Sequence, residues 1–498
     1  MLKNALMIQG TTSNAGKSIL TAGLCRLLKN RAVNVAPFKP QNMALNSFVT
    51  IGGGEIGRAQ VLQAFACGKE PHTDMNPVLL KPTTDTGSQI ILNGQVIAQM
   101  GARQYHQFKS KLLNPVCEAF ARLAAQHQFI MIEGAGSPAE INLRENDIAN
   151  MGFAEAIDCP VLLVADIERG GVFAHLYGTF ALLSQSEQQR IRGFIINRFR
   201  GDVSLLKSGI DWLHEKTGKP TLGVVPFLNN LRLDAEDSLS RNSSTKSTEE
   251  GSKKFRISVL VTPKMSNDSD IEPLLANPDI AVEFVGDGKA IEACDLIILC
   301  GSKSVRSDLA YIRSQGWIDE IHRHLRYGGK LIGICGGFQM LGKTISDPSG
   351  VESVAGCSDG LGLLDLHTEI KSSKILKRVS GKLCLEDALI EGYEIHMGQS
   401  QGSALENPAV VTEYGRDGAM SNDNQIMGTY IHGIFDRKET LQAVLRWCGF
   451  NKHQAFDFQL FRESQIERLA DCLSDNLELN LIFPDQGALA SATCSSNF

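Results

Sequence analysis

The sequence lacks a metal-binding cysteine pattern, a long apolar run and a surplus of positive charge. Its 12 cysteines are scattered, without a C-x-x-C pair or a histidine cluster at zinc spacing. This predicts a reduced, cytoplasmic protein without structural zinc. No apolar run reaches the length of a membrane span. The formal net charge is -6 and no strong basic patch is present, which argues against nucleic acid or an anionic membrane as the main partner.

The composition that remains is typical of a globular protein, with 43% hydrophobic and 21% charged residues. A chain of 498 residues is long enough for roughly two to four domains. Residues 238–254, SLSRNSSTKSTEEGSKK, have no large apolar side chain after Leu239 and are interpreted as a linker. We therefore predict a first domain at 1–237, a second at 255–445, and a helical extension with a mobile tail at 446–498.

The first domain is organised around a phosphate-binding loop near the N-terminus. An apolar run at residues 5–8 leads into QGTTSNAGKS and then into a helix-like run. In such a unit backbone N–H groups face a phosphate, Lys17 reaches the β/γ-phosphates, and the Ser18 hydroxyl binds Mg²⁺. Five residues separate Gly10 from Gly16, one more than in the common motif. We expect the loop to bind ATP through Gly10, Thr12, Ala15, Gly16, Lys17 and Ser18. The alternative is a Gly/Ser turn that merely joins a strand to a helix.

Charged side chains follow several predicted strands of this domain. Lys39 follows the run at 33–38, Glu133 ends the buried run at 129–132, and Asp166 ends the run at 161–165. Strands that alternate with helices indicate a parallel sheet, whose carboxyl-terminal strand ends bind ligands. We expect Lys39 to hold a substrate carboxylate or a phosphate, and Glu133 to be a second Mg²⁺ ligand. A solvated lysine and a helix-capping acid are the plainer alternatives.

The second domain has a cysteine in a sharp predicted turn. Residues 330–342, KLIGICGGFQMLG, run from a strand into a helix, with Cys335 in a G-x-C-x-G pattern. This is a cysteine version of the nucleophile elbow. The Gly336 N–H is one natural donor to an oxyanion, and the turn at Gly301 is expected to supply another. The alternative is a buried, inert cysteine.

A cysteine nucleophile requires a histidine base, and two histidines downstream are suitable. His432 ends a strand-like run in GTYIHGIFD, whereas His396 lies in GYEIHMG. Each histidine taken alone is more often structural than catalytic. Because the cysteine elbow is present, we expect one of them to be the base, and we prefer His432.

These motifs resemble, in wording and order, the cobyric acid synthase family. The strings are QGTTSNAGKS, PFKPQNMALNS, GGEIGRAQ, MNPVLLKP, EGAGSPAEINLR and DIERGGVFA, then CGSKS, GICGGFQMLG, GYEIHMG and GTYIHGIFD. The resemblance covers about residues 3–440. It implies an α/β fold: a dethiobiotin-synthetase-like P-loop domain with a parallel sheet, followed by a class I glutamine amidotransferase-like α/β domain.

The resemblance also implies an activity. Members of the family use glutamine and ATP to amidate the b, d, e and g carboxylates of adenosylcobyrinic acid a,c-diamide in cobalamin biosynthesis. Cobalt enters only as part of this corrinoid substrate. The catalytic pair of the family corresponds to Cys335 and His432. Similarity to dethiobiotin synthetase implies that Lys39 contacts the substrate carboxylate and Asn197 the adenine base.

The resemblance leaves the rest of both sites less complete. Glu55 and Asp166 are expected to complete the metal or substrate site. Ordinary class I amidotransferases carry an acid two residues after the histidine base, where this chain has Ile434. The third member of the site is missing at its usual place, and Glu394 is considered as a substitute that orients the base.

Three alternative functions fit parts of the sequence. Cobyrinic acid a,c-diamide synthase is closely related, but PFKPQNMALNS and SPAEINLR argue against it. A P-loop switch ATPase with an inert amidotransferase-like domain would share the longer loop, yet would not need Cys335 and His432 together. A ligase that takes free ammonia would not need the thiol. No feature of the sequence fixes an oligomeric state.

Overall fold

The computed structural model describes residues 4–82, 87–233, 254–352, 354–451 and 456–484. All but the last residue of the expected linker, and the expected mobile tail, lie outside this part of the chain. Among the described residues, no helix combines the length and the apolar character that crossing a membrane would require.

The chain divides into two compact units. The first contains the described residues of Met1–Ala44, Gly54–Glu236 and Arg462–Phe498, and the second contains those of Leu45–Gly53 and Asp237–Phe461. This division differs from a single cut at the linker in two places. Leu45–Gly53 packs with the second unit, and the chain from Arg462 onward packs with the first.

The first unit is built on a six-stranded sheet in the order β12-β11-β10-β1-β9-β2. Every described pairing in this sheet is parallel. The central strands β1, β9 and β10 are buried along their whole length, as in a sheet that helices cover on both faces. The strands are β1 (Ala5–Gly10), β2 (Val35–Phe38), β9 (Phe129–Glu133), β10 (Val161–Asp166), β11 (Ile191–Phe199) and β12 (Thr221–Pro226).

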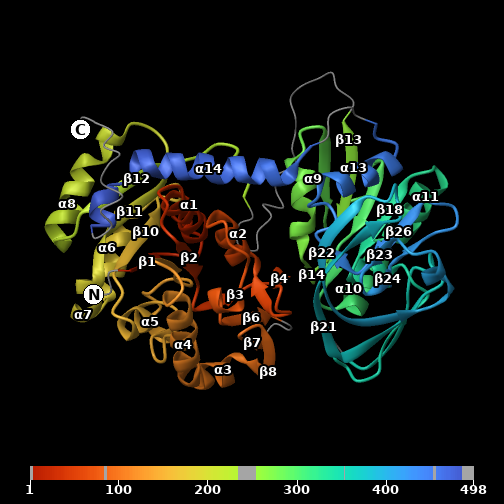
Figure 1. The fold of residues 1–498 in the computed structure, drawn as a ribbon, viewed down its shortest axis with the longest axis horizontal. Helices are drawn as coiled ribbons and strands as arrows, with labels where there is room; N and C mark the ends of the chain where they lie inside the picture. Colours follow the sequence, from red (N-terminus) through yellow and green to blue (C-terminus); the bar gives the residue numbers. More distant parts are fainter. Residues whose placement is uncertain (1–3, 83–86, 234–253, 353, 452–455, 485–498) are drawn as a thin grey trace. The chain divides into compact units, whose positions relative to one another are not determined.

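Helices and a smaller sheet complete the first unit. In Figure 1, α6 and α8 lie beside β10, β11 and β12. The helices are α1 (Lys17–Asn30), α2 (Arg58–Ala66), α3 (Ala102–Phe108), α4 (Leu113–Ala124), α5 (Met151–Ala156), α6 (Val172–Leu182), α7 (Gln185–Arg190) and α8 (Lys207–Thr217). The smaller sheet has the order β3-β6-β7-β8. Its strands are β3 (Gln41–Met43), β6 (Val78–Pro82), β7 (Gly87–Leu92) and β8 (Gln95–Gly101), and β5 (Glu55–Gly57) lies nearby in sequence.

The C-terminal helices supply part of the core of the first unit. From Arg462 onward, α14 (Phe458–Asn476) packs against α1, and α15 (Leu479–Ile482) follows it. A Cβ atom on Gly23 of α1 would lie 2.5 Å from Leu473 Cδ1. The buried Arg26 guanidinium of α1 donates to Glu463 and Glu467 of α14, at 2.7 and 2.8 Å. The expected helical extension therefore packs against one face of α1, the helix that follows the phosphate loop.

The second unit contains a second, largely parallel sheet, in the order β15-β13-β16-β18-β26-β25. Its last strand alone pairs antiparallel in the described ladder. The strands are β13 (Phe255–Leu260), β15 (Ile280–Val285), β16 (Leu296–Leu299), β18 (Lys330–Ile334), β25 (Ala419–Met420) and β26 (Ile426–Thr429). The helices are α9 (Glu272–Ala276), α10 (Val305–Ser314), α11 (Trp317–Arg326), α12 (Gly336–Met340) and α13 (Lys438–Trp447).

A further sheet of the second unit is mostly antiparallel and was not predicted. Its strands are β19 (Thr344–Asp347), β20 (Gly356–Asp359), β21 (His367–Leu383), β22 (Leu389–Gln401), β23 (Val410–Thr412), β24 (Gly415–Asp417) and β27 (Ile431–His432). The short strands β14 (Met265–Ser266) and β17 (Gly301–Ser302) pair with each other, and β4 (Ser47–Val49) lies in the segment that joins this unit.

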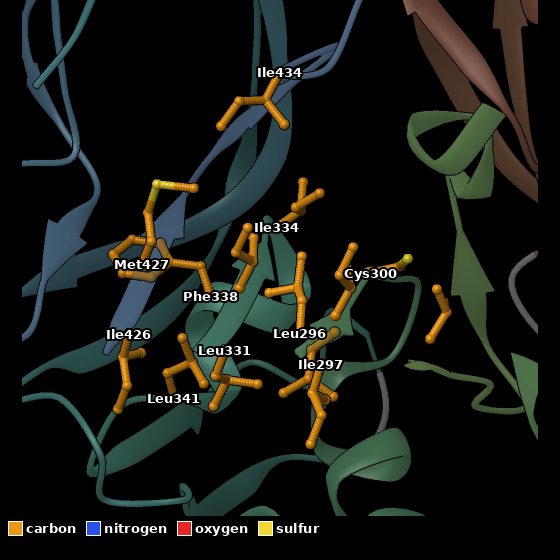
Figure 2. Close-up of a cluster of buried hydrophobic side chains, with 14 of the residues drawn as sticks. Leu296, Ile297, Cys300, Leu331, Ile334, Phe338, Leu341, Ile426, Met427 and Ile434 are labelled. Carbon is orange, nitrogen blue, oxygen red and sulfur yellow. The ribbon is translucent and has the colours of Figure 1, made fainter. Parts of the chain in front are cut away.

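The apolar core of the second unit lies directly beneath the cysteine turn. Figure 2 shows side chains from β16, β18, α12 and β26 packed together. Phe338 is fully buried there, and a Cβ atom on Gly428 of β26 would lie 2.0 Å from its ring. This packing fixes the height of α12 above the sheet, and with it the position of Cys335.

Candidate functional site

Cys335 occupies the turn between β18 and α12, as the G-x-C-x-G pattern predicts. Its backbone has φ 53° and ψ -105°, a strained conformation for a residue other than glycine. The Cys335 N–H donates to Thr429 O at 2.8 Å. A Cβ atom on Gly337 would lie 2.0 Å from Leu299 O, so the turn requires glycine to approach β16 this closely. The side chain is buried, with Sγ 3.8 Å from Ile395 O.

His432 is held by a carboxylate that the sequence interpretation did not identify. Asp270 lies in a 3-10 turn at Asp268–Ile271, and its Oδ2 is 2.6 Å from His432 Nδ1. The other oxygen, Oδ1, accepts the Gly433 N–H at 2.8 Å. Both side chains are buried. The carboxylate therefore fixes the ring through Nδ1.

The electrostatics of His432 follow from these neighbours. Burial lowers its pKa, but the Asp270 charge and hydrogen bond, together with a hydrogen bond and charge from Cys335, raise the pKa to about 9. The structure thus brings Cys335 and His432 together, with Asp270 on the far side of the ring. Asn267 Nδ2 lies 3.3 Å from His432 Nε2.

Glu394, considered as the orienting acid, has other partners. Glu394 Oε2 lies 3.1 Å from His396 Nε2, and its Oε1 pairs with Lys377 at 3.0 Å. Burial raises the Glu394 pKa, but the hydrogen bonds and charges of His396 and Lys377 outweigh it and hold that pKa below its usual value. His396 in turn stacks on Tyr430, with ring centroids 3.9 Å apart. The orienting position at His432 belongs to Asp270, so the suggestion of Glu394 was wrong.

Asp270 was missed because nothing in the sequence links it to the histidine. The two residues are 162 positions apart. Asp270 lies in NDSDIEP, far from the usual position of the acid two residues after the histidine. A polar stretch with two acids after a buried strand was the available signal. It is shared by many surface turns.

The two expected oxyanion donors lie side by side. A Cβ atom on Gly336 would be 2.6 Å from Ser302 N, so the backbone after Cys335 touches the turn at 301–302. Gly301 also approaches the base, since its Cβ position would be 3.3 Å from His432 Cε1. The turn at 301–302 thus contacts the residue that follows Cys335 and lies beside the His432 ring.

In the first unit, the loop after β1 has the geometry of a phosphate cradle. Gly16 has φ 91°, and Lys17 Nζ donates to Thr12 O at 3.0 Å and to Ser13 O at 2.9 Å. Asn197 Nδ2 donates to Ala15 O at 2.9 Å. The Lys17 side chain therefore lies against the loop backbone, and Asn197 of β11 contacts the loop at Ala15. A Cβ atom on Gly10 would lie 3.0 Å from Lys17 Nζ.

Glu133 is the centre of a buried polar cluster beside this loop. Its Oε1 accepts from Ser18 Oγ at 2.7 Å and from Lys39 Nζ at 2.8 Å, and its Oε2 accepts from Gln63 Nε2 at 2.5 Å. Three of the predicted residues thus meet at the carboxyl ends of β2 and β9. Gln63, on α2, was not predicted, because a glutamine within an apolar helical run has no distinctive spacing.

The oxygen atoms of Ser18 and Glu133 suit Mg²⁺. Hard oxygen ligands are its preference, and it is usually held by one or two protein groups together with phosphates and water. Among the described residues, no group of three or more His, Cys, Asp or Glu side chains is placed to form a metal cage. The donor set therefore fits a nucleotide-bound metal, and Lys39 Nζ lies 2.8 Å from the same Glu133 oxygen that accepts from Ser18.

The other two acids predicted for this unit have basic partners. Glu55 forms a buried ion pair with Lys81 at 2.5 Å. Asp166 pairs with Arg198 at 3.0 Å and accepts the Glu168 N–H at 2.9 Å. Asp166 ends β10, next to Asn197 in the register of β11.

Comparisons with known proteins agree with this division of sites. The model for the CobQ/CobB/MinD/ParA nucleotide binding domain matches residues 6–240, and the model for the CobB/CobQ-like glutamine amidotransferase domain matches residues 256–440. With the parallel sheets described above, these matches confirm the predicted fold class.

Several solved structures resemble parts of the chain. PurLQS from Thermotoga maritima is 18% identical over 39% of this chain and 99% of its own, with a TM-score of 0.30. A glutamine amidotransferase from the same organism is 14% identical over 48% of this chain and 100% of its own, with a TM-score of 0.28. The signal recognition particle receptor FtsY from Elizabethkingia anophelis, in complex with GDP, is 12% identical over 45% of this chain and 57% of its own, with a TM-score of 0.27.

The pairing of the two domains indicates the general chemistry. A nucleotide-binding domain joined to a glutamine amidotransferase domain supports ATP-dependent amidation with glutamine as the nitrogen donor. One chain that carries both the CobQ/CobB-type nucleotide-binding domain and the CobB/CobQ-like amidotransferase domain fits the CobB/CobQ family.

Proposed function

We propose that the protein is a cobyric acid synthase, which amidates the b, d, e and g carboxylates of adenosylcobyrinic acid a,c-diamide to give adenosylcobyric acid. The observation that carries the chemistry is the buried Cys335–His432–Asp270 array in the same chain as the Ser18–Glu133 cluster. The corrinoid acceptor is supported by the long motif strings, above all PFKPQNMALNS and SPAEINLR. Its cobalt belongs to the substrate.

In the second unit, the cysteine releases ammonia from glutamine. Cys335 Sγ attacks the side-chain amide carbon, and the oxyanion that forms is held by backbone N–H groups of Gly336 and the turn at Gly301. His432 donates a proton to the departing nitrogen, so that ammonia leaves and a glutamyl thioester remains. The same histidine then takes a proton from the water that hydrolyses the thioester. Asp270 keeps the ring in place throughout.

In the first unit, ATP activates the acceptor. A carboxylate is a poor electrophile, so its oxygen first attacks the γ-phosphorus of ATP and ADP leaves. Ammonia then attacks the acyl phosphate, and phosphate departs as the amide forms. Lys17 stabilises charge on the transferred group, and Lys39 binds the acceptor carboxylate. Ser18 and Glu133 would hold Mg²⁺, which neutralises phosphate charge when bound.

The remaining predicted residues take supporting roles in this proposal. Asn197, which brackets the loop at Ala15, contacts the adenine base. Glu55 and Asp166 line the acceptor or metal side of the same unit, each beside a basic partner.

The test compares two acceptors. Wild-type protein is given ATP, Mg²⁺ and glutamine with either adenosylcobyrinic acid a,c-diamide or cobyrinic acid, and mass spectrometry counts the carboxyl groups converted to amides. We expect the a,c-diamide to be converted at its b, d, e and g positions, with ATP turnover. Amidation of cobyrinic acid at a and c alone would assign the protein to the diamide synthases. Glutamate release without any corrinoid product would show that the acceptor is a different carboxylate.

A further inference from the structure

A short segment from the first part of the sequence belongs to the glutaminase unit. Leu45–Gly53 interrupts the first unit in sequence, beginning six positions after Lys39 and ending two before Glu55, yet it packs with the second unit. Asn46, Ser47 and Phe48 are buried there. Neither the composition nor the motif spacing explains why a synthetase sequence should contribute to this unit.

The polar contacts of this segment lead to the turn that carries Asp270. Asn46 Nδ2 donates to Asp268 Oδ1 at 2.7 Å, and the Ser47 N–H donates to Asn267 Oδ1 at 3.2 Å. Asn267 is the residue whose Nδ2 lies 3.3 Å from His432 Nε2. The segment is therefore one side chain removed from the base.

The aromatic contacts lead to the other side of the same histidine. The Phe48 ring lies 4.8 Å from that of Tyr393, and the Tyr393 hydroxyl donates to Ser47 O at 3.0 Å. Tyr393 pairs with His432 across β22 and β27, and the two rings stack at 5.4 Å with 22° between their planes. The Arg378 guanidinium lies over the Phe48 ring, 4.8 Å from its centre.

We propose that Asn46, Ser47 and Phe48 are positioning residues for the glutaminase. They hold Asn267, Asp268 and Tyr393, and these in turn hold His432 against Cys335 and Asp270. The proposal rests on the glutaminase half of the proposed function. Because a misplacement of about 1 Å in a reacting group costs on the order of a hundredfold in rate, contacts one residue away from the base have measurable effects.

The segment also gives the glutaminase a covalent link to the synthetase sequence. Lys39, six positions before the segment, and Glu55, two positions after it, belong to the first unit, which in the proposed function binds ATP and the acceptor. The glutaminase therefore cannot be completed by residues 254–484 alone.

The experiment measures glutamate release and ammonia-dependent amidation in the full chain. The variants are Asn46→Ala, Asn46→Asp, Phe48→Leu and Phe48→Ala. Ile51→Ala is the matched control, since Ile51 lies in the same segment but is 71% exposed. The thermal unfolding midpoint and ATP binding are recorded for every variant, so that a loss of folding is recognised.

We expect the glutaminase kcat to fall about tenfold in Phe48→Ala, with the KM for glutamine nearly unchanged. The glutaminase kcat of Phe48→Leu should fall less, because leucine keeps a large apolar side chain at this position. The glutaminase kcat should be lower in Asn46→Asp than in Asn46→Ala, because aspartate places a second carboxylate beside Asp268. Amidation supplied with ammonium should stay at the wild-type rate, and Ile51→Ala should match wild type in both assays.

Two results would overturn the proposal. One is an unchanged glutaminase kcat in both Asn46→Asp and Phe48→Ala. The other is a parallel loss of ammonia-dependent amidation, which would show that the segment supports the whole fold and not the base. If Phe48→Ala does not fold, the glutaminase kcat of Asn46→Ala and Asn46→Asp tests the proposal. Absence of glutamate release in wild type would instead refute the glutaminase assignment itself.

Discussion

At the scale of the residue, the central feature is an imidazole held between a carboxylate and a thiol. His432 carries a pKa of about 9 because the charges of Asp270 and Cys335 outweigh the effect of burial. Its imidazolium form therefore persists through neutral pH. In the proposed mechanism, this is the form that donates a proton to the departing nitrogen.

The substitution Asp270→Asn tests this arrangement. Without the carboxylate charge the His432 pKa falls, so the alkaline limb of the glutaminase pH profile should move to lower pH. The kcat should fall by about a hundredfold or more, because the ring also loses the group that orients it. The measurement is kcat/KM for glutamine between pH 6 and 10. Asp287→Asn, at an exposed acid of the same unit, is the control and should leave the profile in place.

The same pair makes the stability of the fold depend on pH. The folded pKa of about 9 lies above the ordinary value of 6.5, so the folded state binds the proton more tightly. The stabilisation is fully present below about pH 6.5 and is lost as the pH rises through about 9. The difference in unfolding free energy between wild type and Asp270→Asn should shrink from pH 6 to pH 10. A difference that stays constant across this range in urea titrations would contradict the assigned pKa.

A residue of the site could be predicted only where it belongs to a recognisable motif or ends a recognisable strand. The cysteine turn and the phosphate loop are contiguous strings, so Cys335, Lys17 and Ser18 could be located directly. Glu133 could be placed because it ends an apolar run. Asp270 and Gln63 could not, since each reaches its partner only through the tertiary fold, at separations of 162 and 70 residues.

At the scale of the element, the close approach of α12 to β16 places the thiol. A methyl group on Gly337 would meet the Leu299 carbonyl, which belongs to the backbone of a buried strand and cannot move aside cheaply. We expect Gly337→Ala to cost about 1–3 kcal/mol of unfolding free energy and to reduce glutamate release. Gly286→Ala is the matched control, because nothing lies within 4 Å of its Cβ position. Equal urea midpoints for the two variants would contradict this packing.

Helix α14 offers a second test at this scale. Leu473 is fully buried against α1, whereas Leu460, on the same helix, is 69% exposed. Leu473→Ala should lower the unfolding free energy by about 2–5 kcal/mol. Leu460→Ala should change it by less than about 0.5 kcal/mol. Chemical denaturation of the full chain distinguishes them, and a similar cost for both would contradict the packing of α14 on the P-loop helix.

The sequence predicts an element when the residues that determine it are close together in the chain. The hairpin of β7 and β8 turns at Asn93 and Gly94, both with positive φ, and this dipeptide is a strong local signal. The long antiparallel pair β21 and β22 has no such signal, because its register shifts and its faces are mixed. The placement of Leu45–Gly53 in the second unit depends on contacts more than 200 residues away in sequence, as Asn46 and Asp268 illustrate.

At the scale of the whole molecule, the proposed function joins two reactions in one chain. One unit contains Cys335, His432 and Asp270, and the other contains the phosphate loop with its acidic and basic side chains. Neither set alone makes an amide from glutamine. The proposed function therefore requires that the nitrogen released at Cys335 is the nitrogen captured by the ATP-activated acceptor.

Isotope labelling follows this nitrogen from donor to product. Wild type, Cys335→Ala and Lys17→Ala are given ATP, Mg²⁺ and adenosylcobyrinic acid a,c-diamide, with either amide-¹⁵N-glutamine or ¹⁵N-ammonium. We expect ¹⁵N in the wild-type product from both donors, in the Cys335→Ala product from ammonium alone, and in no product of Lys17→Ala. Labelled product from glutamine in Cys335→Ala would contradict the proposed function.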